Sequence, residues 1–482
     1  MKSVKFNLFM NFILTASSFI FPMVTFPYVS RVLGAAGNGK IDFIASVASY
    51  FSMVASLGIP TYGIRACAAV RDDKEKLSKT AQELIIIHAI MTVISLSFFF
   101  VAMFGVDRLH QEEELMIING VSLFLNVLGG NWLYSALEQY QYITVRSIFF
   151  KIISVFLMFA LIHKKEDYIL YGAITVFAAA GSNILNFINL RKHIFLKPYK
   201  EYNLKQHMKP ILVFFAQSIA ITVYTNLDTV MLGFMKDDTE VGLYAAAVKV
   251  KNILSSLVTS LGTVMLPRLS YYIKNDRLDE FKKMIHTAVE FVLVISLSLS
   301  FYFVIMAEES ILLLSGTSYV DATLAMQIII PTIIFIGLSN ITGIQFLTPL
   351  NKEKYVLFSV IVGAVVDLIL NIIFIPGMGA AGAALGTLVA EISVLLVQVY
   401  LIKKEFSYGI FSMNTILQVI SATTISGIVL LVVKNTIELT VFFKLLITSI
   451  VFFAIFLVIC VLVKIQIVQD GLRKISLRLG IR

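Results

Sequence analysis

Apolar runs of about 20 residues recur along the whole chain, and this is the length that a helix needs to cross the hydrocarbon core of a bilayer. Charged residues make up only 14% of the 482 positions, against about 25% in ordinary soluble domains. A membrane β-barrel is excluded, because barrel strands alternate apolar and polar residues over segments of about ten. The chain is therefore predicted to be an all-α polytopic membrane protein.

The apolar runs predict about 14 transmembrane helices. They span residues 6–30, 41–64, 81–103, 114–136, 147–163, 168–190, 210–235, 241–266, 284–306, 322–347, 355–376, 378–401, 412–433 and 441–463. The first run lacks a small-residue cleavage site, so it is predicted to be a membrane helix and not a removable signal. The two cysteines, Cys67 and Cys460, are too far apart in the sequence to indicate a disulfide framework or a metal site.

One stretch of the sequence occurs twice. Residues 27–65 and 226–268 each contain an apolar helix, a Gly-rich turn, a second apolar helix and a basic end. An offset of 203 residues carries Gly39 onto Gly242 and Arg65 onto Arg268. Such a duplication is typical of transporters built from two related halves.

The duplication predicts the domain organisation. The longest polar connection, residues 191–210, separates the two copies and is predicted to link two lobes of six helices each. We expect an N-terminal lobe at 1–200, a C-terminal lobe at 201–405, and two additional helices with a cytoplasmic tail at 406–482.

The basic residues predict the orientation. With the N-terminus in the cytoplasm, the cytoplasmic segments hold 28 Lys and Arg and the outer segments hold 7. Such an excess marks the cytoplasmic side. Both termini are therefore expected in the cytoplasm, and the net charge of +9 needs no nucleic-acid partner to explain it.

The sequence contains no sign of an enzyme active site. It lacks the phosphate-binding Gly-x-x-x-x-Gly-Lys-Ser/Thr motif, the Gly-x-Ser-x-Gly motif and the His-Glu-x-x-His motif. We expect no cofactor and no bound metal. A polytopic chain of this kind is most simply a transporter.

Ionisable side chains within membrane helices are candidate functional residues, because charge is costly in hydrocarbon. The candidates for the substrate cavity, with their polar neighbours, are Lys251, Lys249, Asp228, Asn226, Arg31 and Gln217. The candidates for a coupling ion are Asp367, Glu391 and Asp228. His88 and Glu290 are expected to have structural roles, the former through hydrogen bonds.

Lys249 and Asp228 are predicted at a similar depth, about 10–12 Å from the outer face, so that they could pair. Lys251 lies deeper on the same helix and points another way, since two residues correspond to about 200° of rotation. We expect Lys251 to bind an anion. Pro22 and Pro27 are expected to bend the first helix, either as a moving part or as a static kink.

The sequence resembles the bacterial polysaccharide repeat-unit flippases of the Wzx type, which belong to the same superfamily as the multidrug and toxic-compound extrusion transporters. The similar motifs are Pro27-Tyr28-Val29-Ser30-Arg31-Val32-Leu33-Gly34, Trp132-Leu133-Tyr134 with Glu138 and Arg146, Asn226-Leu227-Asp228, Gly242-Leu243-Tyr244 and Gly382-Ala383-Ala384. Asn131 departs from the pattern, since relatives often carry an aspartate before the tryptophan.

The resemblance implies a V-shaped bundle of two lobes in the bacterial cytoplasmic membrane. It also implies the cargo, an undecaprenyl-pyrophosphate-linked oligosaccharide, and a polysaccharide polymerase as a further partner. The alternatives are an ion-coupled drug or cation antiporter of the same fold and a flippase for another cell-wall lipid. A membrane-embedded polymerase or ligase would need large outer loops, whereas the longest one expected here is residues 307–321.

Overall fold

The computed structural model describes residues 4–406, 412–470 and 473. Helices account for nearly all of the described chain, and no strand occurs in it. Twelve helices of the described chain are long and apolar enough to cross a membrane. The protein is a multi-pass all-α membrane protein, as the composition predicts. Its helices group into two compact units, residues 1–242 and 243–482, which are described separately below.

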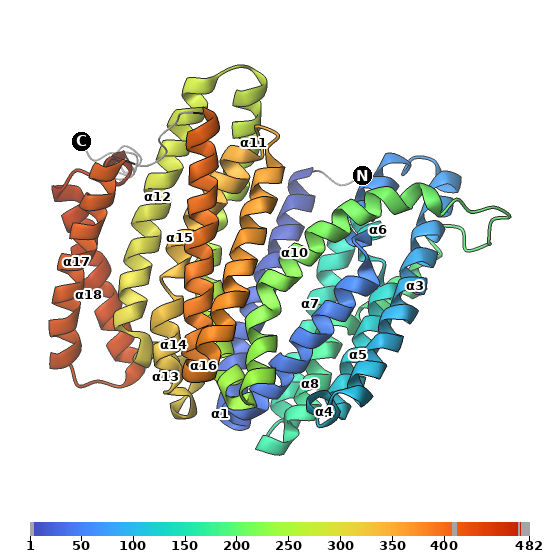
Figure 1. The fold of residues 1–482 in the computed structure, drawn as a ribbon, viewed down its shortest axis with the longest axis horizontal. Coiled ribbons are helices and arrows are strands. Elements are labelled where there is room, and N and C mark those ends of the chain that lie inside the picture. Colours follow the sequence, from blue (N-terminus) through green and yellow to red (C-terminus); the bar gives the residue numbers. More distant parts are fainter. Residues whose placement is uncertain (1–3, 407–411, 471–472, 474–482) are drawn as a thin grey trace. The chain divides into compact units, whose positions relative to one another are not determined.

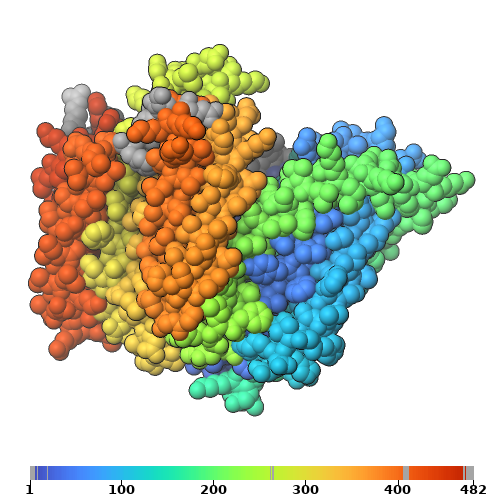
Figure 2. Space-filling view, in the orientation of Figure 1, coloured from blue at the N-terminus to red at the C-terminus, as the bar shows by residue number. Residues whose placement is uncertain are grey.

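The N-terminal unit contains one very long helix followed by shorter ones (Figure 1). Its helices are α1 (Val4–Ser56), α2 (Ile59–Ala69), α3 (Lys74–Gly105), α4 (Asp107–His110), α5 (Glu113–Gly129), α6 (Asn131–Ala136), α7 (Tyr140–Leu161), the 3₁₀ turn η1 (Lys165–Asp167), α8 (Tyr168–Val176), the π-helical turn η2 (Phe177–Gly181), α9 (Asn183–Leu190) and α10 (Lys205–Met235). In Figure 2, α10 lies across the exposed face of this unit, where it packs on α1.

The C-terminal unit likewise contains one very long helix, α16, together with shorter ones. Helix α11 (Asp238–Lys274) begins in the last residues of the first unit and continues through the boundary. It is followed by α12 (Leu278–Ile305), α13 (Ala307–Ser315), the 3₁₀ turn η3 (Thr317–Tyr319), α14 (Ala322–Ile329), α15 (Thr332–Asn340), the π-helical η4 (Ile341–Leu347), α16 (Glu353–Phe406), α17 (Met413–Thr436) and α18 (Val441–Leu462).

Two of the candidate membrane helices are about twice the length of a single span, which reconciles the twelve helices with about 14 predicted spans. The segments 9–69 and 353–404 contain 61 and 52 residues. Within these segments, α1 and α16 each contain one glycine with non-helical torsion angles, Gly34 (φ 70°) in α1 and Gly379 (φ 52°) in α16. A left-handed φ is disfavoured for residues with a Cβ, so these glycines permit the two turns.

The expected bend at Pro22 and Pro27 does not interrupt α1. Both prolines lie within the helix, and the one residue with non-helical torsion angles in its described part is Gly34. Neighbouring polar groups can satisfy the carbonyls that a proline frees in a membrane helix. The non-helical turn of α1 is therefore at the glycine, and a bend at the two prolines stays a prediction.

Several predicted spans are interrupted where the sequence suggests continuity. Gly130 (φ 48°) separates α5 from α6, and Pro331 separates α14 from α15. The expected outer loop at 307–321 is largely helical, because it contains α13 and η3. These breaks follow Gly, Pro and π-helical turns, which a count of apolar residues does not detect.

The two copies of the duplicated hairpin contact each other reciprocally at their glycines. A Cβ on Gly39 would overlap the carbonyl oxygen of Asp238, and a Cβ on Gly242 would overlap the carbonyl oxygen of Ala35. Ala35 and Asp238 each lie four residues before the glycine of their own copy. The contact of Gly39 with Asp238 and the contact of Gly242 with Ala35 are therefore equivalent, as expected for two segments related by a local two-fold axis.

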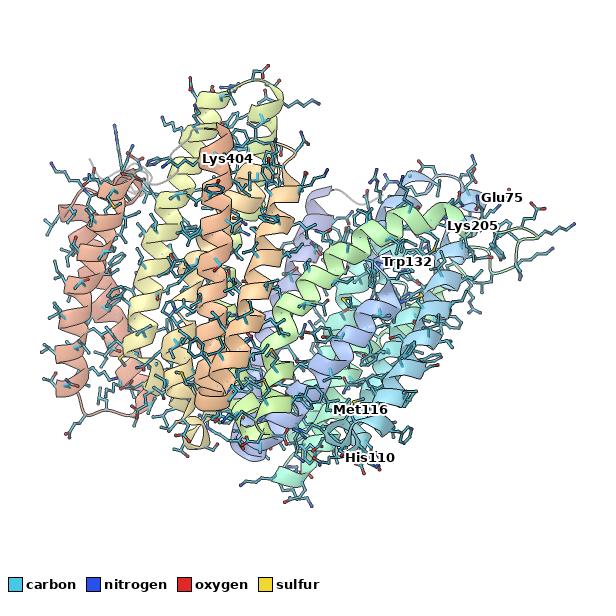
Figure 3. The ribbon with its side chains drawn as sticks, in the orientation of Figure 1. Glu75, His110, Met116, Trp132, Lys205 and Lys404 are labelled. Carbon is cyan, nitrogen blue, oxygen red and sulfur yellow. The ribbon has the colours of Figure 1, made fainter. Side chains whose placement is uncertain are left out.

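The core of the N-terminal unit includes the single tryptophan of the chain, Trp132, labelled in Figure 3. Its ring packs so closely on Gly63 that a Cβ there would lie 2.7 Å from Cε3. In the same figure Glu75 and Lys205 lie at one end of this unit and His110 and Met116 at the other. The connections after successive predicted spans thus lie at opposite ends of this unit, as the predicted order of spans requires.

The expected lobes at 1–200 and 201–405 remain a prediction. The compact units divide at Gly242, whereas the predicted lobes divide in the polar connection before α10. Compactness groups helices by contact, and it does not test which helices move together.

Candidate functional site

The predicted cavity residues of the N-terminal unit lie on α1 and α10. Asp228 is buried and Gln217 is exposed. The side-chain amide of Asn226 donates to the carbonyl of Thr222 at 3.0 Å and to the hydroxyl of Thr225 at 2.9 Å. Arg31 is exposed and donates through Nη1 to the carbonyl of Pro27 at 2.5 Å. These four side chains thus have different environments.

The other predicted site residues belong to the C-terminal unit. Lys249 and Lys251 are half-buried on α11. Asp367 and Glu391 are buried on the two halves of α16, with Asp367 next to Gly386, where a Cβ would lie 3.1 Å from its Oδ1. Asp228 and Lys249 belong to different units, and their pairing stays a prediction.

Two minor expectations have clear outcomes. Glu290 is buried and close to two polar side chains, with His286 Nδ1 at 3.8 Å and Thr415 donating at 3.4 Å, which fits a structural role. His88 is buried as well, but neither ring nitrogen has a hydrogen-bond partner among the described residues. The expectation that His88 is hydrogen-bonded is therefore wrong.

The most elaborate polar network of the N-terminal unit surrounds Arg146 of α7. This side chain is 5% exposed. Its Nη2 donates to Oδ1 of Asn131 at 2.8 Å, and its Nη1 donates to the carbonyl of Ser182 at 3.1 Å. Its guanidinium lies 5.7 Å from the ring centre of Tyr142. One arginine thus connects α6, α7 and the end of η2.

Asn131 stands where relatives often carry an aspartate, and its side-chain oxygen still accepts two hydrogen bonds. Its Oδ1 accepts from Arg146 and also from Nδ2 of Asn186 at 2.9 Å. Asn186 donates in addition to the carbonyl of Gly129 at 2.5 Å. A neutral amide therefore holds the arginine in place, and the positive charge of Arg146 is not neutralised by this neighbour.

A cavity of about 800 Å³ opens beside this network. Arg146, Tyr142 and three amide side chains form its polar wall, together with Glu138, while Val145, Phe149 and Leu185 form an apolar wall. Glu138 pairs with Arg71 at 2.6 Å, so its charge is already compensated. Such a mixture of one cation, amides and hydrocarbon suits an amphipathic anion more than a reactive centre.

A second buried polar cluster joins α2, α3 and α10. The carboxylate of Glu83 contacts Nε2 of His207 at 2.8 Å, and Nδ1 of the same ring is 2.9 Å from the hydroxyl of Tyr62. Glu83 also accepts from the backbone of Asn203 at 2.7 Å. The cluster fixes the end of the 191–204 connection to the helices beneath it. The sequence gives no sign of this cluster, because His207 is 124 residues from Glu83 and 145 residues from Tyr62.

Two ion pairs lie at the end of the N-terminal unit opposite to Glu75. Arg108 pairs with Asp238 and donates to the carbonyl of Gly233 at 3.0 Å. Lys40 pairs with Glu112. Asp238 also forms the close contact with Gly39, and Lys40 is the next residue in the sequence, so both ion pairs lie beside the contact of Gly39 and Gly242.

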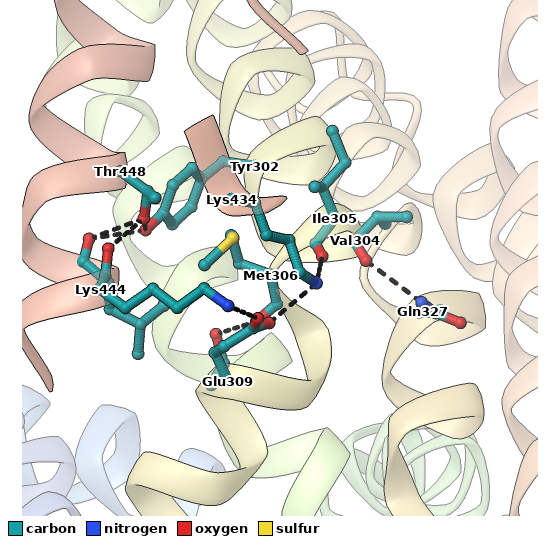
Figure 4. A network of polar contacts seen from close by, with 11 residues as sticks. Tyr302, Val304, Ile305, Met306, Glu309, Gln327, Lys434, Lys444 and Thr448 are labelled. Carbon is teal, nitrogen blue, oxygen red and sulfur yellow. Dashed lines mark hydrogen bonds and ion pairs between the residues drawn. The ribbon is translucent and has the colours of Figure 1, made fainter. Parts of the chain in front are cut away.

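In the C-terminal unit, a carboxylate is held between two lysines (Figure 4). Glu309 of α13 pairs with Lys434 of α17 at 3.0 Å and with Lys444 of α18 at 3.2 Å. Lys434 also donates to the carbonyl of Ile305 at 2.9 Å. The cluster anchors the last two helices to α12 and α13.

No group of three or more His, Cys, Asp or Glu side chains suited to a metal ion occurs in the described part of the chain. Asp367 and Glu391 therefore are not accompanied there by a third such ligand. Their proposed role with a coupling ion stays a prediction.

Comparison with known families gives two matches. The profile of the family described as "Polysaccharide biosynthesis protein" matches residues 4–273, and that of the family described as "MatE" matches residues 214–373.

Among curated proteins, the "Putative O-antigen transporter" of Escherichia coli (strain K12) is 24% identical over 401 residues, which cover 81% of this chain and 94% of the relative. The "Lipid II flippase MurJ" of Bacillus subtilis (strain 168) is 26% identical over 240 residues, which cover 45% of this chain and 42% of the relative.

Among solved structures, the inward closed conformation of the lipid II flippase MurJ matches with a TM-score of 0.74 at 16% identity, covering 95% of this chain and 99% of that one. At this identity the match concerns the fold.

Proposed function

Because the chain belongs to the polysaccharide biosynthesis protein family, we propose that it is a flippase for undecaprenyl-pyrophosphate-linked oligosaccharide repeat units. It would carry them across the cytoplasmic membrane for capsule or O-antigen synthesis. The observation that carries this proposal is the family match over residues 4–273, more than half of the 482-residue chain. A relative named as an O-antigen transporter and matched over 94% of its own length supports it.

The chemistry of the cargo fits the residues available in both units. A pyrophosphate needs positive charge, which the half-buried Lys251 and the buried Arg146 carry. Sugar hydroxyls need donors and acceptors, which the amides of Asn226 and Gln217 supply. A polyprenyl chain is satisfied by hydrocarbon, including the apolar groove between α12 and α18, about 740 Å³ in volume.

We propose the orientation that the basic residues predict, with both termini and the 191–210 connection in the cytoplasm, where the lipid-linked unit would be assembled. The delivered unit is then available at the outer face to a polysaccharide polymerase. Asp367, Glu391 and Asp228 remain the proposed residues for a coupling ion.

The test is the fate of the lipid-linked intermediate. Deletion of the gene should leave repeat units accumulated on the cytoplasmic side, detected by mass spectrometry of extracted lipids and by loss of surface polymer. Wild-type complementation should restore both. Unchanged lipid-linked intermediates and normal surface polymer in the deletion strain would contradict the proposal.

One observation favours a second function. The MatE profile matches residues 214–373, and an inward-facing multidrug transporter of that family has a TM-score of 0.64 at 14% identity, covering 80% of this chain and 96% of that one. An antiporter of cationic drugs would lower the accumulation of a fluorescent cation in cells that overproduce the chain. The flippase is expected to leave that accumulation unchanged.

A further inference from the structure

The cavity beside Arg146 contains two buried polar atoms without a partner in the described chain. Nε of Arg146 is a donor and Oδ1 of Asn7 is an acceptor, and neither has a hydrogen bond there. Both side chains line the same cavity of about 800 Å³. Buried polar atoms are normally satisfied, so an unsatisfied donor and an unsatisfied acceptor on two side chains of one cavity wall indicate that this wall is suited to a polar occupant.

The charge of the cavity selects the occupant. Glu138 is paired with Arg71 at 2.6 Å, whereas the guanidinium of Arg146 is held by the neutral oxygens of Asn131 and Ser182. The uncompensated charge at this wall is therefore positive. An arginine with a free N–H suits a phosphate oxygen, because charge-assisted hydrogen bonds are the stronger ones.

The other walls specify what the phosphate is attached to. Gln139, Gln141 and Asn7 line the cavity with amides, which both donate and accept, as sugar hydroxyls require. Val145 and Phe149 lie four residues apart on one face of α7 and are 59% and 57% exposed. On a membrane-spanning helix, such a face suits a hydrocarbon chain.

The position of Arg146 along α7 also fits a lipid-linked ligand. Arg146 is six residues from the start of α7 at Tyr140, or about 9 Å at the rise of an α-helix. The cavity thus lies near one end of a candidate membrane helix, which is the region of a span nearest to lipid head groups.

We propose that this cavity binds the junction of the lipid-linked cargo. The phosphate lies at Arg146, the first sugar lies against Asn7, Gln139 and Gln141, and the first isoprene units lie along Val145 and Phe149. This inference rests on the proposed function, and it assigns to the N-terminal unit the phosphate, the first sugar and the first isoprene units of the cargo.

The test measures binding to the purified full-length protein in nanodiscs of neutral lipid by native mass spectrometry. The probes are undecaprenyl pyrophosphate bearing one N-acetylhexosamine, undecaprenyl phosphate without sugar, and phosphatidylglycerol. The glycosylated probe should bind at least about tenfold more tightly than phosphatidylglycerol, since the amide contacts add to the charged one. Equal binding of all three probes would overturn the assignment, because it would show a general anionic-lipid surface.

Variants at Gln141 probe the cavity while leaving the Arg146 network intact. Gln141→Glu should weaken binding of the glycosylated probe about tenfold, and Gln141→Lys should tighten it. The matched control is Lys151→Gln, which removes a cation from the same helix outside this cavity and should leave binding unchanged; Lys151 instead donates to Ser17 at 2.9 Å. Equal effects of Gln141→Glu and Lys151→Gln would contradict a specific site.

Transport distinguishes this inference from the proposed function. If Gln141→Glu loses binding while cells still export polymer normally, the cavity is not on the path of the cargo and the inference fails while the flippase stands. If the deletion strain exports normally, the proposed function fails, whatever the binding shows.

Discussion

Lys251 is the cation of α11 that we expect to bind the pyrophosphate within the C-terminal unit. Lys251→Ala should abolish polymer export with normal amounts of protein in the membrane, and Lys251→Arg should retain part of it, because a guanidinium also binds phosphate. The measurement is surface polymer in a complemented deletion strain, with membrane protein quantified in parallel. Normal polymer from a stably expressed Lys251→Ala would refute this role.

Lys249 is the partner we predict for Asp228. Lys249→Ala should reduce export, because it leaves a buried carboxylate without its compensating charge. Asp228→Asn in the same chain should restore part of the activity, and the double-mutant comparison isolates the pair. An absence of rescue would refute the pairing and would leave the role of Lys251 unaffected.

Asn131 tests how Arg146 is held. Asn131→Ala removes the acceptor of Arg146 Nη2 and of Asn186 Nδ2 and should cost about 1–3 kcal/mol of stability. Asn131→Asp keeps both acceptor contacts and makes the one to Arg146 an ion pair, but it loses the donation of Asn131 Nδ2 to Asn183 at 3.3 Å, so its melting temperature should lie above that of the Ala variant. Thermal unfolding in detergent measures both. An Asp variant as unstable as the Ala variant would contradict this account.

The partners of Arg146 and Glu83 could not be predicted from the sequence. Arg146 belongs to a motif recognised in the sequence, but its acceptor Ser182 is 36 residues away and its cavity partner Asn7 comes from the start of α1. Glu83 and His207 are separated by 124 residues. No local pattern joins such pairs, because their contact depends on how the helices pack.

The ion pairs of Glu309 with Lys434 and Lys444 fix α17 and α18 to the rest of the C-terminal unit. Burial raises the pKa of the Glu309 carboxyl, but the ammonium groups of Lys434 and Lys444 outweigh this and leave the pKa below its ordinary value of 4.5. A carboxyl with a lowered folded-state pKa contributes stability above its ordinary pKa and loses it as the pH falls through the folded value.

The corresponding prediction concerns acid. The difference in melting temperature between wild type and Glu309→Gln should be constant near neutral pH and should shrink below about pH 4.5, as the wild-type carboxyl becomes protonated. The matched control is Glu308→Gln, the neighbouring carboxylate at an exposed position, which should have little effect at any pH. A difference that persists unchanged to pH 3 would show that the lysine pairs do not carry the stabilisation.

The turn in α1 gives a second prediction at this scale. Gly34 has φ 70° and open space around its Cβ position, so Gly34→Ala is opposed by backbone strain alone, about 1–3 kcal/mol. Gly105 also has open space but no left-handed φ, and Gly105→Ala is the control that should be neutral. Thermal unfolding distinguishes them, and equal melting temperatures would show that the turn does not depend on glycine.

For the whole molecule, the regular features were predictable from sequence and the irregular ones were not. The apolar runs indicated the helical fold, and short motifs indicated the family resemblance, since both are local in the sequence. The interruptions at Gly130 and Pro331 were missed, because a broken span is as apolar as a continuous one. The six-helix lobes, the orientation and the roles of the site residues stay predictions.

The orientation is tested on intact cells. A single cysteine at Lys200→Cys should resist an impermeant thiol reagent until the cells are opened, whereas one at Lys164→Cys should react at once. Both native cysteines are buried, and their replacement with serine removes any background. Labelling of position 200 in intact cells would reverse the topology derived from 28 and 7 basic residues.

The reciprocal contact of Gly39 and Gly242 has the form of an interface between identical subunits. In a homodimer with such an axis, one substitution alters both sides of the contact together, so the pair can change size in a single step. In a fused chain the two positions are encoded separately, and a side chain at either one meets the backbone of the other copy. Fusion of the halves thus frees the rest of each copy to diverge, while it leaves these two positions confined to glycine.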